Sequence, residues 1–197
     1  GSEMCIRDRN RIMKFDDCVD KIRNIEMHNC CIRTELLRTN NVSCHEHLFY
    51  VDNEYVVYSL AYADTIVYLD LTVYQYLVGR NGQSVSIESR RRNHEQYMTV
   101  VNYLVGFYED VSWNLSEPKK RFIARKIAYF ITGVYSVMMS YRDAPHKNAL
   151  EQFDGWLREK SIDIYNGNNN ICVTMLRRTN MGMYGMASMI YRTVNRL

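Results

Sequence analysis

Two short motifs carry side chains whose types and spacing could do chemistry. The first, Phe49-Tyr50-Val51-Asp52-Asn53-Glu54-Tyr55, places two carboxylates among aromatic residues. The second, Gly79-Arg80-Asn81-Gly82-Gln83-Ser84-Val85-Ser86, is a glycine-bearing turn that offers a guanidinium group, an amide and hydroxyls. Together they predict a polar site on an apolar frame.

Asp52 has the surroundings of a general base. The side chains of Tyr50, Val51 and Tyr55 would exclude water from its carboxylate, and desolvation raises the pKa of a carboxyl group. Arg80 would act in the opposite direction, because a nearby cation favours the ionised carboxylate and can also bind an anionic group of a substrate. A base beside an anion-binding group is the outline of a transfer site.

A structural alternative accounts for the same residues. Asp52 and Glu54 are also compatible with surface positions at the end of a strand, and residues 79–82 with an ordinary hairpin turn. Clustered carboxylates are often only structural, so the pattern alone leaves both interpretations open.

Residues 25–88 resemble part of the bacterial family 2 glycosyltransferases. Three segments carry the likeness: Cys31-Ile32-Arg33-Thr34-Glu35-Leu36-Leu37, the Asp52 motif, and Val73-Tyr74-Gln75-Tyr76-Leu77-Val78 with the turn that follows it. The resemblance implies the end of a nucleotide-sugar-dependent GT-A domain, in which the run through Asp52 corresponds to the motif that carries the catalytic base. Weaker likenesses at Phe153-Asp154-Gly155-Trp156-Leu157-Arg158-Glu159-Lys160 and Arg177-Arg178-Thr179-Asn180 imply the helical extension of some members.

The activity implied by the resemblance is inverting transfer of a sugar from a nucleoside diphosphate sugar to a hydroxyl of a glycan or lipid-linked acceptor. Such enzymes make bacterial cell-surface polysaccharides and other glycans. Asp52 would remove the proton from the acceptor hydroxyl as its oxygen attacks the anomeric carbon. Arg80 would contact the phosphates or the acceptor, and Gln83 and Ser84 would donate hydrogen bonds.

Two further residues are candidates for the substrate-binding site. Glu54 would orient Asp52 or bind an acceptor hydroxyl, although an outward-facing strand residue is an equal alternative. His28 would lie at the floor of the cleft, unless it is a histidine satisfied within the core.

The donor-binding half of the family's catalytic domain has no counterpart here. Family members bind a divalent cation, Mg²⁺ or Mn²⁺, and the donor diphosphate through an Asp-x-Asp motif, and none precedes Asp52, since Asp16-Asp17 and Asp20 lack its spacing. We therefore expect the cation only in the intact enzyme, and this truncated chain alone to be inactive. The cysteines and histidines also fit no common zinc-ligand spacing; they are Cys30, Cys31, Cys44, His45 and His47.

The expected fold is an α/β remnant of a Rossmann-like GT-A domain followed by an all-α bundle. Residues 1–9 are interpreted as an expression scar or sequencing artefact, residues 10–86 as the acceptor-side part of the catalytic domain, and residues 87–197 as a helical C-terminal domain. Periodicity predicts helices at 15–25 and 33–38, then strands at 65–69 and 71–78. Beyond residue 86 it predicts only helices, about residues 97–108, from Ser116 onward, at 149–157, and at 173–194.

Composition limits the classes of function and location. A net charge of +3 over 197 residues argues against nucleic acid as a partner, although the run Arg90-Arg91-Arg92 keeps that weaker hypothesis open. Six cysteines without scaffold spacing favour the reducing cytoplasm. The most apolar run, residues 127–139, is too short to span a bilayer, and association with the inner face of the membrane stays open.

Two alternatives concern the state of the chain. Strands that lack their partner half would leave unpaired edges, so self-association is expected. The second candidate function is a non-catalytic helical interaction module in which the Asp52 segment is a relic.

Overall fold

The computed structural model describes residues 10–22, 24–72, 74, 75, 77 and 86–195. The first part of the chain contains short elements around one longer helix, namely β1 (Ile12–Lys14), α1 (Phe15–Cys18), η1 (Val19–Lys21), η2 (Met27–Asn29), α2 (Thr34–Thr39), α3 (Asp52–Tyr62) and β2 (Thr65–Val67). The rest is helical, with α4 (Ile87–Arg92), α5 (His94–Val111), η3 (Ser112–Asn114), α6 (Glu117–Met139), α7 (Ala144–Lys160), α8 (Ile162–Asn166), α9 (Ile171–Arg178) and α10 (Tyr184–Val194).

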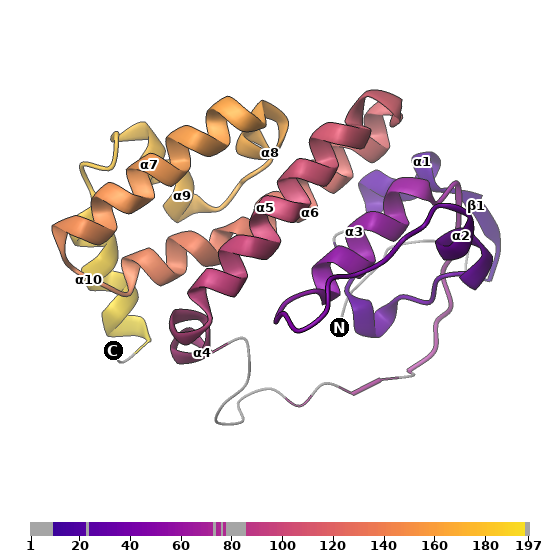
Figure 1. Ribbon diagram of the computed structural model, residues 1–197, viewed down its shortest axis with the longest axis horizontal. Helices are drawn as coiled ribbons and strands as arrows, with labels where there is room; N and C mark the ends of the chain where they lie inside the picture. The colour runs from indigo at the N-terminus through magenta and orange to yellow at the C-terminus, as the bar shows by residue number, and fades with distance from the viewer. Residues whose placement is uncertain (1–9, 23, 73, 76, 78–85, 196–197) are drawn as a thin grey trace.

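Helix α6 is the central element of the fold. It lies beside α5, with α7 to α10 on one side and the N-terminal elements on the other, and it contacts α3, α5, α7, α8 and α10 (Figure 1). Pro118 lacks a backbone N–H, which costs nothing in the first turn because N–H groups there have no acceptor within the helix. Glu117 places a negative charge at the positive end of the helix dipole. One apolar face is fully buried, with Ile127 and Ile131 at 0% exposure. Burial of this face positions the residues that α6 presents to both halves of the chain.

Residues on both sides of position 86 share one hydrophobic core. Phe15 and Val57 from the first part belong to the same buried cluster as Leu104 and Ile127 from the second. The ring of Phe15 meets Phe122 of α6 edge-on, with 5.7 Å between the ring centroids. The first part of the chain is therefore packed directly on the helical bundle.

Helix α6 is also long and apolar enough, by length and composition, to cross a membrane, and it is the one such helix among the described residues. Within its most apolar window, 72% is buried inside the protein. A single helix of this kind is weak support for a membrane span, because buried core helices have the same composition.

The helical prediction for the second part is confirmed, whereas the α/β remnant is not. The only sheet among the described residues is the antiparallel pair β1 and β2, with Met13 opposite Ile66. The strand predicted at 65–69 ends at Val67, and residues 71, 72, 74, 75 and 77 are not in a strand. The side chains of Val67, Leu69 and Leu71 are exposed, so β-branched and apolar composition here does not reflect a buried sheet.

Two predicted helices are broken. The helix predicted at 15–25 is a single turn, α1, followed by the 3-10 helix η1. The helix predicted at 173–194 is divided into α9 and α10, because Asn180 and Met181 adopt left-handed backbone conformations, with φ of 47° and 57°. Such residues end a right-handed helix.

Gly133 of α6 leaves the space that Tyr97 of α5 occupies. A Cβ atom at position 133 would lie 2.7 Å from Cζ of Tyr97 and closer still to its hydroxyl. Tyr97 cannot easily move, because it is 2% exposed, donates a hydrogen bond to the Phe130 carbonyl and stacks on the Phe130 ring at 4.3 Å.

We expect Gly133→Ala to destabilise the protein. Overpacking of this kind costs about 1–3 kcal/mol, which exceeds the gain of about 1 kcal/mol in helix propensity from glycine to alanine. Gly106→Ala in α5 is the matched control, because a Cβ there meets nothing within 4 Å. Urea denaturation should show a loss for Gly133→Ala and none for Gly106→Ala; equal stability of the two variants would contradict this packing.

Candidate functional site

The Asp52 motif forms the start of a helix. Tyr50 adopts a left-handed conformation, with φ of 72°, and α3 begins at Asp52, with Glu54 also in its first turn. Negative charges are favourable at a helix N-terminus because they face unpaired backbone N–H groups. The alternative of a strand end for these residues is therefore wrong.

Asp52 is half-buried and its proton affinity is raised. Burial raises the pKa of its carboxyl group, and the negative charge of Glu26 raises it further. A hydrogen bond from the Asn53 backbone, the positive charge of Lys126 and a hydrogen bond from the Asn53 amide act against this rise. The Asn53 amide nitrogen lies 3.1 Å from Oδ1 of Asp52, so it also orients the carboxylate.

Lys126 brings a buried cation from α6 to this carboxylate. Its Nζ lies 3.2 Å from Oε2 of Glu26 and 3.0 Å from Oδ1 of Asn24, and its side chain is 4% exposed. Burial lowers the pKa of Lys126, while the charges of Glu26 and Asp52 oppose that shift. We call Asn24, Glu26, Asp52 and Lys126 the Asp52 cluster.

Glu54 points away from the Asp52 cluster. It is 0% exposed and accepts hydrogen bonds from the backbone nitrogen of His45 at 2.9 Å and from its Nδ1 at 3.1 Å. The His45 ring stacks on Tyr103, with 3.8 Å between centroids. Residues two apart on a helix do not share a face, so Glu54 anchors the loop before α3. The interpretation of Glu54 as an outward strand residue is wrong.

His28 lies in η2, two residues after Glu26, and its side chain is exposed. Its ring is tilted against that of Tyr74 at a centroid distance of 5.4 Å. The alternative of a core histidine is therefore wrong, and its role in substrate binding stays a prediction. Arg80, Gln83 and Ser84 lie outside the described residues.

Three members of the Asp52 cluster were missed by sequence reasoning. Asn24 and Glu26 belong to irregular backbone around η2, where no periodicity marks them. Lys126 did have a signal: it lies one turn after Phe122 and one turn before Phe130, on the apolar face of α6. A lysine on a buried stripe needs a partner carboxylate, and that partner proves to be Glu26.

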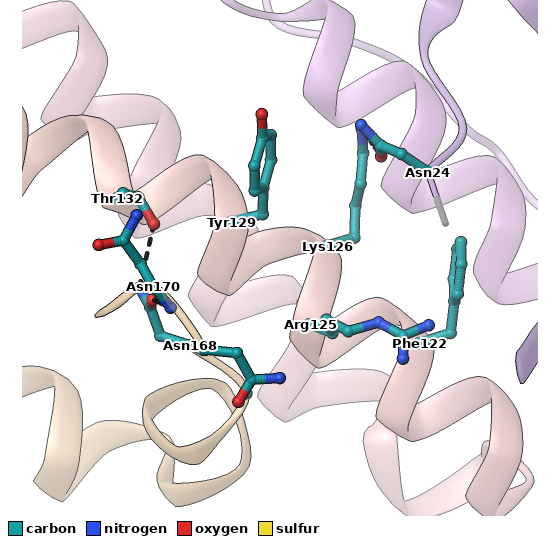
Figure 2. A pocket seen from close by; sticks show the side chains of 10 residues that line it. Asn24, Phe122, Arg125, Lys126, Tyr129, Thr132, Asn168 and Asn170 are labelled. Atoms are coloured by element: carbon teal, nitrogen blue, oxygen red, sulfur yellow. Dashed lines mark hydrogen bonds between the residues drawn. The ribbon is translucent and has the colours of Figure 1, made fainter. Parts of the chain in front are cut away.

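A pocket of about 460 Å³ adjoins the cluster. One wall is α6 and the other is the loop at residues 167–170, and Figure 2 shows Lys126 and Asn24 at its edge. Its lining is Asn24, Phe122, Arg125, Lys126, Tyr129, Thr132, Gly167, Asn168, Asn169 and Asn170. Lys126 and Asn24 thus belong both to the pocket and to the Asp52 cluster.

The Asp52 cluster does not suit the divalent cation that the family resemblance implies. The ammonium group of Lys126 already lies between the oxygens of Glu26 and Asn24. In the part of the chain that the structure describes, no three His, Cys, Asp or Glu side chains are grouped to hold a metal ion.

Lys126→Gln is expected to raise the pKa of Asp52. The substitution removes a positive charge that lowers this pKa, while the amide can still donate to Glu26. Lys120→Gln is the control, because Lys120 lies on the same helix and pairs with Asp163 instead, at 3.2 Å. Carboxyl NMR titration should show a higher Asp52 pKa only in Lys126→Gln; an unchanged or lower value would contradict the arrangement.

Chemically, the cluster can accept a proton. The Asp52 carboxylate has a raised affinity for one, and Lys126 limits that rise, so that the ionised form is available. In comparisons with known proteins, no family model, curated protein or solved structure matches the chain.

Proposed function

We propose that this chain carries the acceptor side of an inverting glycosyltransferase similar to family 2, with Asp52 as its general base. The observation that supports this most is the half-buried carboxylate of Asp52, with its raised pKa, beside the buried ammonium of Lys126. General bases in enzymes are tuned by burial and neighbouring charge in this way. The motifs within residues 25–88 supply the class of reaction, and the finer fold, an acceptor-side remnant of a GT-A domain, belongs to the same proposal.

In the proposed reaction, an acceptor hydroxyl approaches Asp52. The carboxylate takes the hydroxyl proton while the oxygen forms a bond to the anomeric carbon of the donor sugar. The bond from that carbon to the nucleoside diphosphate breaks at the same time, and the diphosphate leaves with the bonding electrons. Lys126 keeps Asp52 ionised before the reaction, because its charge lowers the pKa of the carboxyl group. The donor and the glycan or lipid-linked acceptor would meet on the cytoplasmic side of the membrane.

The test is transfer by the full-length protein. It would be incubated with a panel of nucleoside diphosphate sugars and hydroxyl acceptors, with a characterised family 2 glycosyltransferase as the positive control. We expect release of nucleoside diphosphate with at least one donor and an inverted anomeric configuration in the product. Retention of configuration, or no release while the positive control is active, would contradict the proposal.

A non-catalytic interaction module is the second candidate. Helix α10 exposes an apolar stripe, with Met186 at 43%, Met189 at 48% and Ile190 at 52% exposure. Exposed apolar surfaces of this kind commonly serve interactions between proteins. Failure of transfer in the panel above, together with concentration-dependent association that Ile190→Ser abolishes, would favour this function over catalysis.

A further inference from the structure

We propose that the pocket between α6 and residues 167–170 binds a small saccharide that carries a phosphate or carboxylate group. Its volume of about 460 Å³ lies within the range of about 300–1,000 Å³ that is common for small-molecule sites. Two lining residues, Asn24 and Lys126, are shared with the Asp52 cluster. The proposal rests on the others, Arg125, Tyr129 and residues 168–170, which have no role in the proton transfer assigned to Asp52, so variants of these residues test the binding site by itself.

Arg125 provides the charge that would attract the anionic group. The other cations in the first half of α6 each have a carboxylate partner, and they are Lys119, Lys120, Arg121 and Lys126. Arg125 lines the pocket and has no carboxylate partner in the described parts of the chain, where its contact is with the Phe122 ring at 5.5 Å. A guanidinium group binds phosphate or carboxylate with two parallel hydrogen bonds. An anion in the pocket would supply the missing partner.

The opposite wall is a preformed row of amides. Asn168 is 7% exposed, and its amide nitrogen donates to the Ala128 carbonyl at 3.0 Å and to Oγ1 of Thr132 at 3.2 Å. Its oxygen accepts from the backbone nitrogen of Asn170 at 3.1 Å. These bonds fix the loop against α6, and Figure 2 shows Thr132, Asn168 and Asn170 gathered there.

The same wall has hydrogen-bonding capacity left for a ligand. Asn169 lines the pocket and is exposed, and its amide makes no hydrogen bond within the described residues. The oxygen of Asn170 accepts from the backbone nitrogens of Cys172 and Val173, while its amide nitrogen is without an acceptor in that part of the chain. Amides that can both donate and accept suit the hydroxyls of a sugar.

Tyr129 supplies an apolar face beside these polar groups. Its side chain lines the pocket, is 69% exposed and, among the described residues, packs on no other aromatic ring. Figure 2 shows it next to Lys126 on the α6 wall, across from the asparagines. An exposed aromatic face buries apolar surface when the C–H face of a pyranose ring packs on it. A cation, amides and an aromatic face together match an anionic saccharide better than a neutral sugar or a free anion.

The experiment is calorimetric titration of the 197-residue protein with four probes: glucose 6-phosphate, glucuronate, glucose and inorganic phosphate. We expect glucose 6-phosphate, glucuronate or both to bind more tightly than glucose and phosphate, and the comparison of the first two decides between phosphate and carboxylate. Binding should weaken as salt rises, because part of it is electrostatic. No binding by any probe, or binding of glucose as tight as that of both anionic sugars, would overturn the proposal.

Variants locate the binding. Arg125→Gln should weaken binding of the preferred anionic sugar by about tenfold to a hundredfold, as expected for loss of a charged hydrogen bond. Tyr129→Ala should weaken it by a smaller factor. Arg121→Gln is the matched control, because Arg121 is on the same helix, 58% exposed and paired with Asp20 at 3.5 Å, outside the pocket.

Circular dichroism would confirm that the variants fold. Equal binding by Arg125→Gln and Arg121→Gln would overturn the assignment of the anion to Arg125. If Arg125→Gln fails to fold, Tyr129→Ala is the deciding variant: an unchanged affinity would overturn the assignment of the saccharide to this pocket. These titrations contain no glycosyl donor, so their failure leaves the role of Asp52 untouched, and loss of transfer in an Asp52 variant leaves the pocket untouched.

Discussion

Arg177→Met is expected to lower the free energy of unfolding by about 3–5 kcal/mol, the usual cost of removing one partner of a buried ion pair. Nε of Arg177 lies 2.8 Å from Oδ1 of Asp154, and the two side chains are 11% and 13% exposed. The same guanidinium donates to the Tyr165 carbonyl at 2.6 Å and to the Tyr135 hydroxyl at 2.8 Å. The substitution would leave the largely buried Asp154 carboxylate without its cation, with hydrogen bonds to the hydroxyls of Tyr135 and Tyr165 in place of an ion pair.

Two further variants test this explanation by urea denaturation. Arg178→Met is the control, because Arg178 is the exposed neighbour on α9, and it should change stability by less than about 0.5 kcal/mol. The double variant Arg177→Met/Asp154→Leu should be more stable than Arg177→Met, because it removes the unpaired charge. A double variant as unstable as the sum of its single variants would mean that the two residues do not act as a pair.

The helices of the second part were predictable because their signals are local. Ser116 and Pro118 mark the start of α6, and the apolar spacing of residues 123–134 marks its buried face. The division of the last predicted helix into α9 and α10 was not predictable. It depends on the left-handed backbone conformation of Asn180 and Met181, and methionine rarely adopts that conformation. The Met181 side chain is 3% exposed, so burial outweighs local preference there.

The candidate site was predictable only in part. The residues around Asp52 correctly predicted that desolvation would raise its pKa. They gave no information on Glu26 or Lys126, because these are brought to Asp52 by packing of η2 and α6 against α3. The prediction that Glu54 orients Asp52 was wrong for a local reason. The two residues lie in a helix rather than at the end of a strand, and residues two apart on a helix point in different directions.

Asp52→Asn is expected to reduce transfer by about 10²–10⁴-fold, the usual contribution of a general base. The amide has nearly the same shape but cannot accept the hydroxyl proton.

The Asp52→Asn substitution should not lower the stability of the folded protein. The pKa of Asp52 is raised in the folded protein, so the native state favours the protonated carboxyl, and at neutral pH the ionised form costs stability that the neutral amide does not. In the unsubstituted protein, activity should accordingly rise with pH through the pKa of Asp52.

The most direct measurement is the turnover rate of the full-length protein with Asp52→Asn, compared with the unsubstituted protein and with Asp110→Asn. Asp110 is an exposed aspartate on α5 whose side chain makes no contact with the Asp52 cluster. We predict a loss of at least about a hundredfold for Asp52→Asn alone, with no loss of thermal stability in either variant. Full activity of a folded Asp52→Asn protein would contradict the assignment of Asp52 as the base.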